Sequence, residues 1–134
     1  ERLAQHFLTI KQPYNVNVAG EAAAIASLQD ARYLLQNVAL LRSERDRMVA
    51  SLEAIPWLHP YPSQANFVLC RVDDIKPAAG LTTARRLRDG LRRRGVLVRF
   101  YEGEVLRDCL RISLGLPDDT AALLQALVEV WDEL

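Results

Sequence analysis

Two arginines in two short apolar segments are the residues of this sequence best suited to chemistry. Arg99 lies within GVLVRFYE and Arg111 within CLRISLG, and both segments are rich in residues typical of β-strands. Side chains alternate between the two faces of a strand, so each arginine is expected to point away from its apolar neighbours. If the two strands are adjacent, both guanidinium groups project from the same face of the sheet.

Two neighbouring guanidinium groups repel each other unless an anion lies between them. The planar fork of N–H donors in each group matches a carboxylate or a phosphate in bidentate fashion. The two segments therefore predict an anion-binding site on a sheet face that no helix covers. The alternative is that both side chains are simply solvated on that face.

The remaining chemically capable residues form no catalytic set. Neither histidine has a second histidine or a carboxylate at metal-ligand spacing, so no metal site is expected. Lys11 and Lys76 stand in proline-flanked loops, which do not suggest the desolvated pocket that activates an amine. Cys70 and Cys109 lie in separate apolar segments, and this placement favours free buried thiols.

Length and charge restrict the class of protein. The chain has 134 residues, of which 50% are hydrophobic, enough for the core of one domain. The 17 Lys and Arg are balanced by 17 Asp and Glu, so the net charge does not favour nucleic acid or an anionic membrane as partner. The arginine-rich run at 85–94 is expected to be a solvated helix face. Without a signal peptide or an apolar run of about 20 residues, a cytoplasmic location is predicted.

The longest expected element is a helix from Val18 to Ile55, where apolar residues recur with a period near 3.6. At 1.5 Å per residue it would be roughly 55 Å long, more than the diameter of a compact domain of this size. It must therefore run past the core, pack on a second domain or bend. Its sequence changes near residue 36 from alanine-rich to charged, which suggests different neighbours for the two halves.

The rest of the sequence predicts a two-layer α+β fold. A three-stranded, mainly antiparallel sheet is expected, covered by helices on one face and preceded by the long helix. Gly95 is expected as the left-handed C-terminal cap of the helix that covers residues 82–94. Other expected elements are the end of a helix at 1–9, a turn-rich link at 57–64, a strand at 65–72 and a helix at 117–134.

Several segments together resemble the C-terminal part of histidinol-phosphate aminotransferases, a branch of the class I and II, fold type I pyridoxal-phosphate enzymes. They are KQPYNVN, the alanine-rich helix, ANFVL, RGVLVR and DCLRISLG followed by a terminal helix. Their order and spacing carry the resemblance, which runs through nearly the whole chain. It implies that residues 1–16 end a large-domain segment, residues 17–55 form an interdomain helix and residues 56–134 form the small domain.

The resemblance also implies roles for the two arginines. Arg111 takes the position that binds the substrate's α-carboxylate, and Arg99 the position that helps to bind a phosphate. Leu116 departs from the family pattern, in which a small or hydroxyl residue often follows the glycine. No catalytic or cofactor-binding residue is expected in this chain, because the family's Schiff-base lysine is expected before residue 1.

For the parent protein, the resemblance implies transamination between histidinol phosphate and 2-oxoglutarate in histidine biosynthesis, with pyridoxal 5'-phosphate in a homodimer. The chain alone is expected to be a fragment that is inactive and binds no cofactor. Two alternatives remain open at this point. One is a phosphothreonine decarboxylase-like relative, and the other is a non-catalytic, aminotransferase-like binding or regulatory module.

Overall fold

The computed structural model describes residues 6–7 and 16–134. The helix expected over 1–9 and the KQPYN turn fall largely outside these residues. In the described part, the helices are α2 (Val18–Gln29), α3 (Ala31–Glu53), α4 (Thr83–Arg93) and α5 (Pro117–Glu133). The strands are β1 (Leu58–Pro60), β2 (Phe67–Val72), β3 (Arg99–Phe100) and β4 (Cys109–Ser113).

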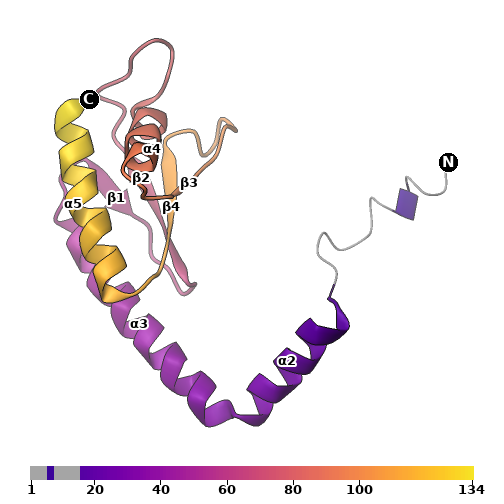
Figure 1. Cartoon of the computed structure of the whole chain (residues 1–134). Coiled ribbons are helices and arrows are strands. Elements are labelled where there is room, and N and C mark those ends of the chain that lie inside the picture. The colour runs from indigo at the N-terminus through magenta and orange to yellow at the C-terminus, as the bar shows by residue number, and fades with distance from the viewer. Residues whose placement is uncertain (1–5, 8–15) are drawn as a thin grey trace. The chain divides into compact units, whose positions relative to one another are not determined.

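The long helix expected from Val18 to Ile55 is interrupted at Asp30, between α2 and α3 (Figure 1). Asp30 leaves helical geometry with a ψ of 53°. Its carboxylate accepts a hydrogen bond from the backbone N–H of Tyr33 at 3.5 Å, and its carbonyl accepts one from Leu34. Aspartate is a favoured first residue of a helix because its side chain satisfies a free N–H there. The expected helix is therefore present as two helices divided at Asp30, so its continuity was wrong, whereas a bend was one of the three expected alternatives.

The chain divides into two units between Asn37 and Val38, close to the change in sequence character near residue 36. Helix α2, in the first unit, has no buried residue. The buried residues of α3 all belong to the second unit and are Glu44, Met48 and Leu52. The domain boundaries expected at residues 16 and 55 stay a prediction.

The sheet has the order β1-β2-β4-β3, with each neighbouring pair antiparallel. The three expected strands are present, and β1 adds a fourth within the segment expected to be a turn-rich link. Proline favours turns in a sequence reading, but Pro60 lies in an edge strand, where its missing N–H donor is tolerated.

Helix α4 has the C-terminal cap that the sequence predicts and a threonine cap at its N-terminus. The Thr82 side chain caps its N-terminus. At the other end Gly95 has a φ of 78°, which confirms it as the left-handed cap. Gly95 N–H donates to the Arg92 carbonyl at 3.1 Å and Val96 N–H to the Leu91 carbonyl at 3.0 Å. This is the Schellman pattern. Strand β3 begins at Arg99, later in the segment GVLVRFYE than the sequence predicts.

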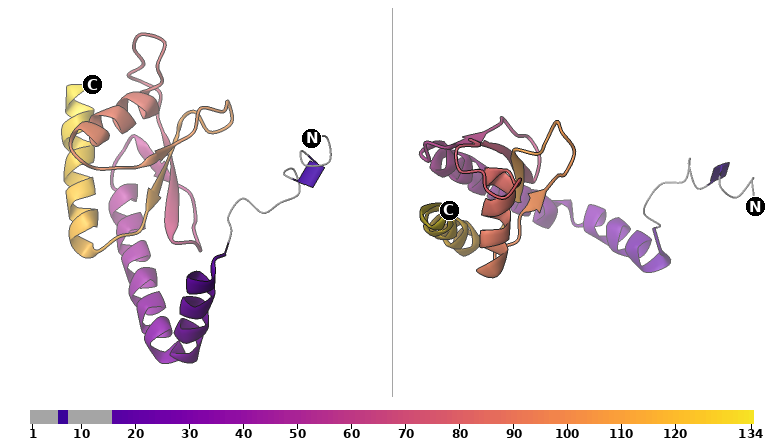
Figure 2. Two further views of the ribbon diagram at one scale, coloured as in Figure 1. Left: turned by 45° about the vertical axis from the view of Figure 1, so that its right-hand side comes forward. Right: turned by 90° about the horizontal axis from the view of Figure 1, so that it is seen from above.

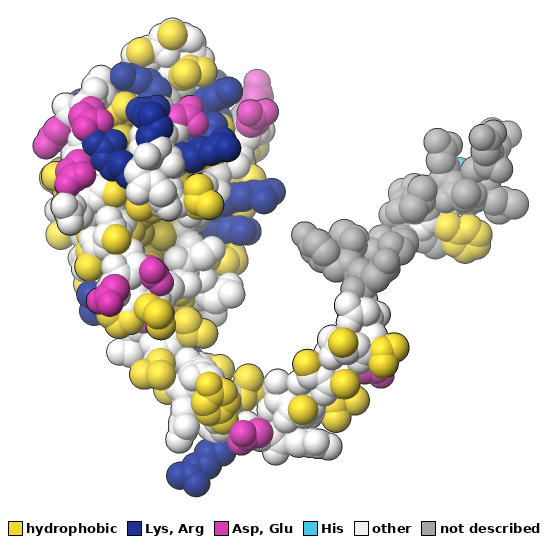
Figure 3. Space-filling view, in the orientation of Figure 1, with side chains coloured by type: hydrophobic (Ala, Val, Ile, Leu, Met, Phe, Trp, Pro, Cys, Tyr) yellow, Lys and Arg dark blue, Asp and Glu magenta, His cyan; other side chains and the backbone are white. Residues whose placement is uncertain are grey.

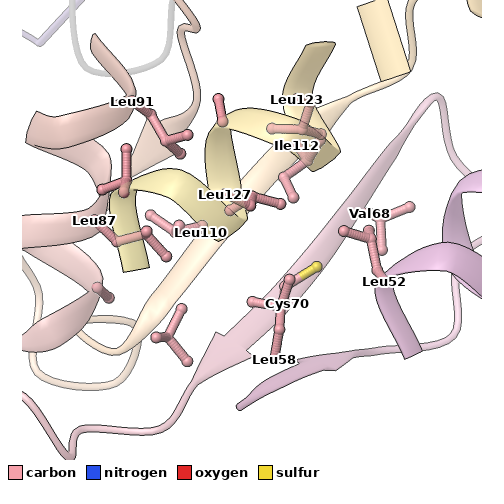
Figure 4. Packing of buried hydrophobic residues seen from close by; sticks show 14 of the residues in the cluster. Leu52, Leu58, Val68, Cys70, Leu87, Leu91, Leu110, Ile112, Leu123 and Leu127 are labelled. Atoms are coloured by element: carbon pink, nitrogen blue, oxygen red, sulfur yellow. The ribbon is translucent and has the colours of Figure 1, made fainter. Parts of the chain in front are cut away.

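The core lies between one face of the sheet and the helices α4 and α5, with the C-terminal part of α3 (Figures 1 and 2). Figure 4 shows the aliphatic side chains of these elements converging in one cluster. Its members include Leu52, Leu58, Val68, Cys70, Leu87, Leu91, Leu110, Ile112, Leu123 and Leu127. The second unit is thus a two-layer α+β fold with the helical cover on one face, as the sequence predicts.

Candidate functional site

The two arginines lie directly opposite each other on neighbouring strands. Arg99 of β3 is the cross-strand partner of Arg111 of β4, and Leu69 of β2 pairs with Arg111 on its other side. Residues that pair directly across a sheet point to the same face. The alternate residues Leu110 and Ile112 belong to the core. The arginines therefore share the face away from the core, the juxtaposition that strand alternation predicts.

Arg111 is half-buried, and a ring of β2 lies under its guanidinium group. Its Cζ atom is 4.9 Å from the centroid of the Phe67 ring, within the range of a cation–π contact. The Nε atom of Arg111 is buried and meets no hydrogen-bond acceptor within the described part of the chain. The Nε atoms of Arg85 and Arg88 share this feature, so it points to an anion only together with the position of Arg111 opposite Arg99.

Arg99 is exposed, and its Cζ atom lies 5.7 Å from the centroid of the Tyr101 ring. Among the residues that the structure describes, no carboxylate forms an ion pair with Arg99 or Arg111. The two positive charges are thus not neutralised by the described residues. Such a pair can hold a carboxylate or a phosphate between the two side chains.

A neighbouring polar cluster on the same face is neutralised internally. His59 of β1 pairs with Arg71 of β2. Asp73 Oδ1 accepts a hydrogen bond from Arg71 Nη1 at 2.9 Å and lies 3.0 Å from His59 Nε2. The hydrogen bond with His59, together with the Arg71 contacts, lowers the pKa of the Asp73 carboxyl. Arg71 already has a carboxylate partner, which distinguishes it from Arg99 and Arg111.

The turn after β4 is tightly built. A Cβ atom on Gly115 would lie 2.6 Å from Asp119 Oδ2, so only glycine fits there without a shift. The same Oδ2 accepts a hydrogen bond from the backbone N–H of Leu116 at 2.8 Å. The Leu116 side chain is exposed, so its difference from the family pattern introduces no packing conflict.

The anion site is a sheet face and not an enclosed pocket. A cavity of about 440 Å³ lies between Met48 of α3, the first turns of α5, the end of β4 and the segment 94–98, and Arg99 and Arg111 are absent from its lining. In Figure 3 Lys and Arg side chains gather over the region of α4 and β3, with Asp and Glu side chains among them. Two α4 arginines take part in ion pairs, Arg85 with Glu102 and Arg88 with Asp89.

The described residues do not fit a pyridoxal-phosphate cradle. Lys11 lies outside them. Lys76 Nζ donates to the Trp131 carbonyl at 2.7 Å and lies 4.7 Å from the Trp131 ring centroid, so this amine is engaged with α5.

The thiols of Cys70 and Cys109 are free and buried, and burial raises the pKa of Cys70 to about 12, which disfavours a nucleophilic thiolate.

Sequence alternation identified the two arginines but not the groups around them. The stacking of Phe67 on Arg111 depends on the cross-strand register of β2 and β4, which the sequence does not reveal. The contact of Asp73 with His59 depends on β1, which the sequence predicts only as part of a turn-rich link. The one available signal for Phe67 was an aromatic residue of the right alternation in the strand segment ANFVLCRV.

Comparisons with known proteins give a consistent family match. The family model "Aminotransferase class I and II" matches residues 1–128. The histidinol-phosphate aminotransferase of Roseiflexus castenholzii is 47% identical over 130 residues, which are 97% of this chain and 34% of that protein. Histidinol-phosphate aminotransferase 1, chloroplastic, of Arabidopsis thaliana is 38% identical over 96% of this chain and 30% of its own length. The chain spans about a third of the length of these curated relatives.

Solved structures match the fold over nearly the whole chain. Histidinol-phosphate aminotransferase from Sinorhizobium meliloti, in complex with pyridoxal-5'-phosphate, has a TM-score of 0.73 and 32% identity, covering 97% of this chain and 34% of that one. L-threonine-O-3-phosphate decarboxylase from Porphyromonas gingivalis has a TM-score of 0.68 at 18% identity, and the match covers 99% of this chain and 39% of that one. The second match concerns the fold alone, so the fold does not separate transamination from decarboxylation.

Within residues 6–7 and 16–134, no helix is long and apolar enough to cross a membrane.

Proposed function

Because this chain belongs to the class I and II aminotransferase family, we propose that the protein carrying it transaminates histidinol phosphate with 2-oxoglutarate in histidine biosynthesis. The observation that carries the proposal is the opposed pair Arg99 and Arg111, two guanidinium groups without ion-pair partners in the described chain. The relatives that bear this activity in their names support it at 47% and 38% identity.

The two arginines have different surroundings that suit two different anions. Arg111 is half-buried with an Nε donor that has no acceptor in the described chain, and we assign it the α-carboxylate of 2-oxoglutarate, since histidinol phosphate carries a phosphate ester and no carboxylate. Arg99 is exposed at the edge strand, which suits the larger and more hydrated phosphate of the amino substrate. The role of the chain is thus to recognise and orient the substrate.

The natural protein is proposed to use pyridoxal 5'-phosphate, which supplies the electron sink for transamination when it is bound. This chain is assigned as its C-terminal small domain with the interdomain helix. No described residue is assigned to the cofactor, so the chain alone is expected to be inactive. A cytoplasmic homodimer is the proposed state of the natural protein.

Replacement of Arg111 tests this function in the natural protein that carries the chain. Arg111→Ala removes a charge-assisted contact, and the expected cost is about 2 kcal/mol, or roughly 30-fold in kcat/KM for 2-oxoglutarate. The matched control is Arg107→Ala, since the side chain of Arg107 is 60% exposed and lies outside the pair. Unchanged kcat and KM in the Arg111 variant would contradict the assignment.

The fold match to the phosphothreonine decarboxylase keeps decarboxylation as the second candidate. Product analysis separates the two reactions. Release of carbon dioxide from O-phosphothreonine, with no amino transfer to 2-oxoglutarate, would replace the aminotransferase proposal. Absence of turnover with both substrates in the cofactor-loaded natural protein would favour a binding or regulatory module.

A further inference from the structure

The Arg111 side chain has few polar contacts to fix its direction. It is half-buried, its Nε atom has no acceptor among the described residues, and no carboxylate there forms an ion pair with it. An arginine side chain has many rotamers, and ordering it on ligand binding has an entropic cost. A contact that restricts the guanidinium group before the anion arrives lowers this cost.

The Phe67 ring provides that contact. Phe67 pairs directly with Ser113, so it is the diagonal neighbour of Arg111 on the same sheet face. The ring centroid lies 4.9 Å from Arg111 Cζ, and Phe67 is itself half-buried in β2. A ring in this position attracts the guanidinium group by a cation–π contact and leaves its N–H edges free for hydrogen bonds.

We propose that Phe67 is a positioning residue that holds the Arg111 guanidinium group in the orientation that accepts a carboxylate. This inference rests on the proposed role of Arg111 as the carboxylate ligand. Phe67 does not itself bind the anion in this account, and it acts by reducing the freedom that Arg111 loses on binding. Its ring should therefore change substrate affinity and leave the chemical step unchanged.

The two arginines can be tested separately because each has its own ring. Arg99 lies 5.7 Å from Tyr101, on another strand from Phe67. Phe100 offers a matched control, since it is a half-buried phenylalanine of the same sheet that packs against the core. Its ring lies 5.4 Å from Arg88 and has no such contact with Arg111.

The first experiment follows the Nε–H signal of Arg111 by ¹⁵N NMR in the natural protein that carries the chain. The wild-type signal should show a rigid N–H group, with a high heteronuclear NOE, and should be slow to exchange with solvent. Phe67→Leu should abolish both properties, whereas Phe67→Tyr and the control Phe100→Leu should preserve them. An Nε–H signal unchanged in Phe67→Leu would overturn the proposal, whatever the enzymatic activity of the natural protein.

The second experiment measures kinetics in the natural, cofactor-loaded protein. Phe67→Leu should raise KM for 2-oxoglutarate about tenfold with kcat changed less than about twofold, the pattern of lost uniform binding. Phe67→Tyr should restore KM. In an Arg111→Lys background, Phe67→Leu should have little further effect on KM, because the group that it positions is gone.

The outcomes separate this proposal from the proposed function. Equal effects of Phe67→Leu in the wild-type and Arg111→Lys backgrounds would show a merely structural role and overturn the inference. A lower kcat with an unchanged KM in the Phe67→Leu variant would also overturn the inference. If the natural protein does not transaminate, the proposed function fails, and the NMR comparison still decides whether Phe67 orients Arg111.

Discussion

At the scale of single residues, Arg99 and Arg111 are chemically identical but differently placed. Arg99 is exposed on the edge strand β3, where solvent weakens its contacts, while Arg111 is half-buried on the inner strand β4. The proposed roles follow this difference. The phosphate contact should be the weaker and more salt-dependent of the two.

The substitution Arg99→Ala should therefore raise KM for one substrate only. We expect KM for the phosphorylated amino donor to rise about tenfold, with KM for 2-oxoglutarate changed less than about twofold, because only the donor carries a phosphate. Steady-state kinetics with each substrate varied in turn, at low and high salt, would check this. An equal rise for both substrates would show that Arg99 serves the shared site and not the phosphate.

Strand alternation was sufficient to place both arginines on the open sheet face, because a period of two fixes the face of every side chain. It did not identify Phe67, whose contact with Arg111 depends on register between strands that lie about 40 residues apart in the sequence. Register is a tertiary property, so the ring beneath the guanidinium group is visible only in the structure.

At the scale of elements, α4 and α5 approach each other at a glycine. A Cβ atom on Gly90 would lie 2.2 Å from Val130 Cγ1, so a side chain there would force the helices apart. Gly90→Ala should destabilise the fold by about 1–3 kcal/mol, the usual cost of overpacking, despite the better helix propensity of alanine. Urea unfolding of the chain measures this difference.

Two further variants make this helix-packing prediction specific. Val130→Ala in the Gly90→Ala background should recover part of the lost stability, because it removes the atoms that the new methyl group meets. Gly103→Ala is the control, since nothing lies within 4 Å of a Cβ atom there. A stability of Gly90→Ala equal to that of wild type would mean that α4 and α5 adjust without strain.

The differences between the expected and the observed elements have local physical causes. Hydrophobic periodicity continued through Asp30, but the aspartate side chain satisfies a free N–H and starts a new helix there. Pro60 suggested a turn, yet an edge strand tolerates it, and β1 has a partner on one side only. Helix caps were more reliable: Gly95 was predicted as the left-handed residue because the requirement for positive φ is local.

At the scale of the whole molecule, a buried carboxylate joins two helices of the second unit. Glu44 of α3 accepts hydrogen bonds from Thr120 Oγ1 of α5 at 2.5 Å and from Arg47 Nη2 at 2.6 Å. Arg47 also donates to the Pro117 carbonyl at 3.1 Å. The hydrogen bond from Arg47, and then that from Thr120, lowers the pKa of the Glu44 carboxyl.

This lowered pKa predicts a dependence of stability on pH. A carboxyl with a lower pKa in the folded state stabilises the fold above its unfolded pKa, and this contribution disappears as the pH falls through the folded pKa. The lowered pKa of Asp73 acts in the same direction. The free energy of unfolding should therefore be nearly constant around neutral pH and should decrease below about pH 4, the range of ordinary carboxyl pKa values.

The variant Thr120→Val isolates the contribution of the Glu44 carboxylate to the free energy of unfolding from that of the other carboxylates. The variant keeps the shape of the side chain but loses the hydrogen bond, so the pKa of Glu44 should move up toward its ordinary value. The variant should then be less stable than wild type at pH 7, and the difference should shrink as the pH falls through the folded-state pKa of Glu44 and the carboxylate is protonated. Urea unfolding at pH 7 and at the lowest pH at which both proteins still fold measures this. An equal difference at both would mean that Thr120 stabilises the α3–α5 contact independently of the charge on Glu44.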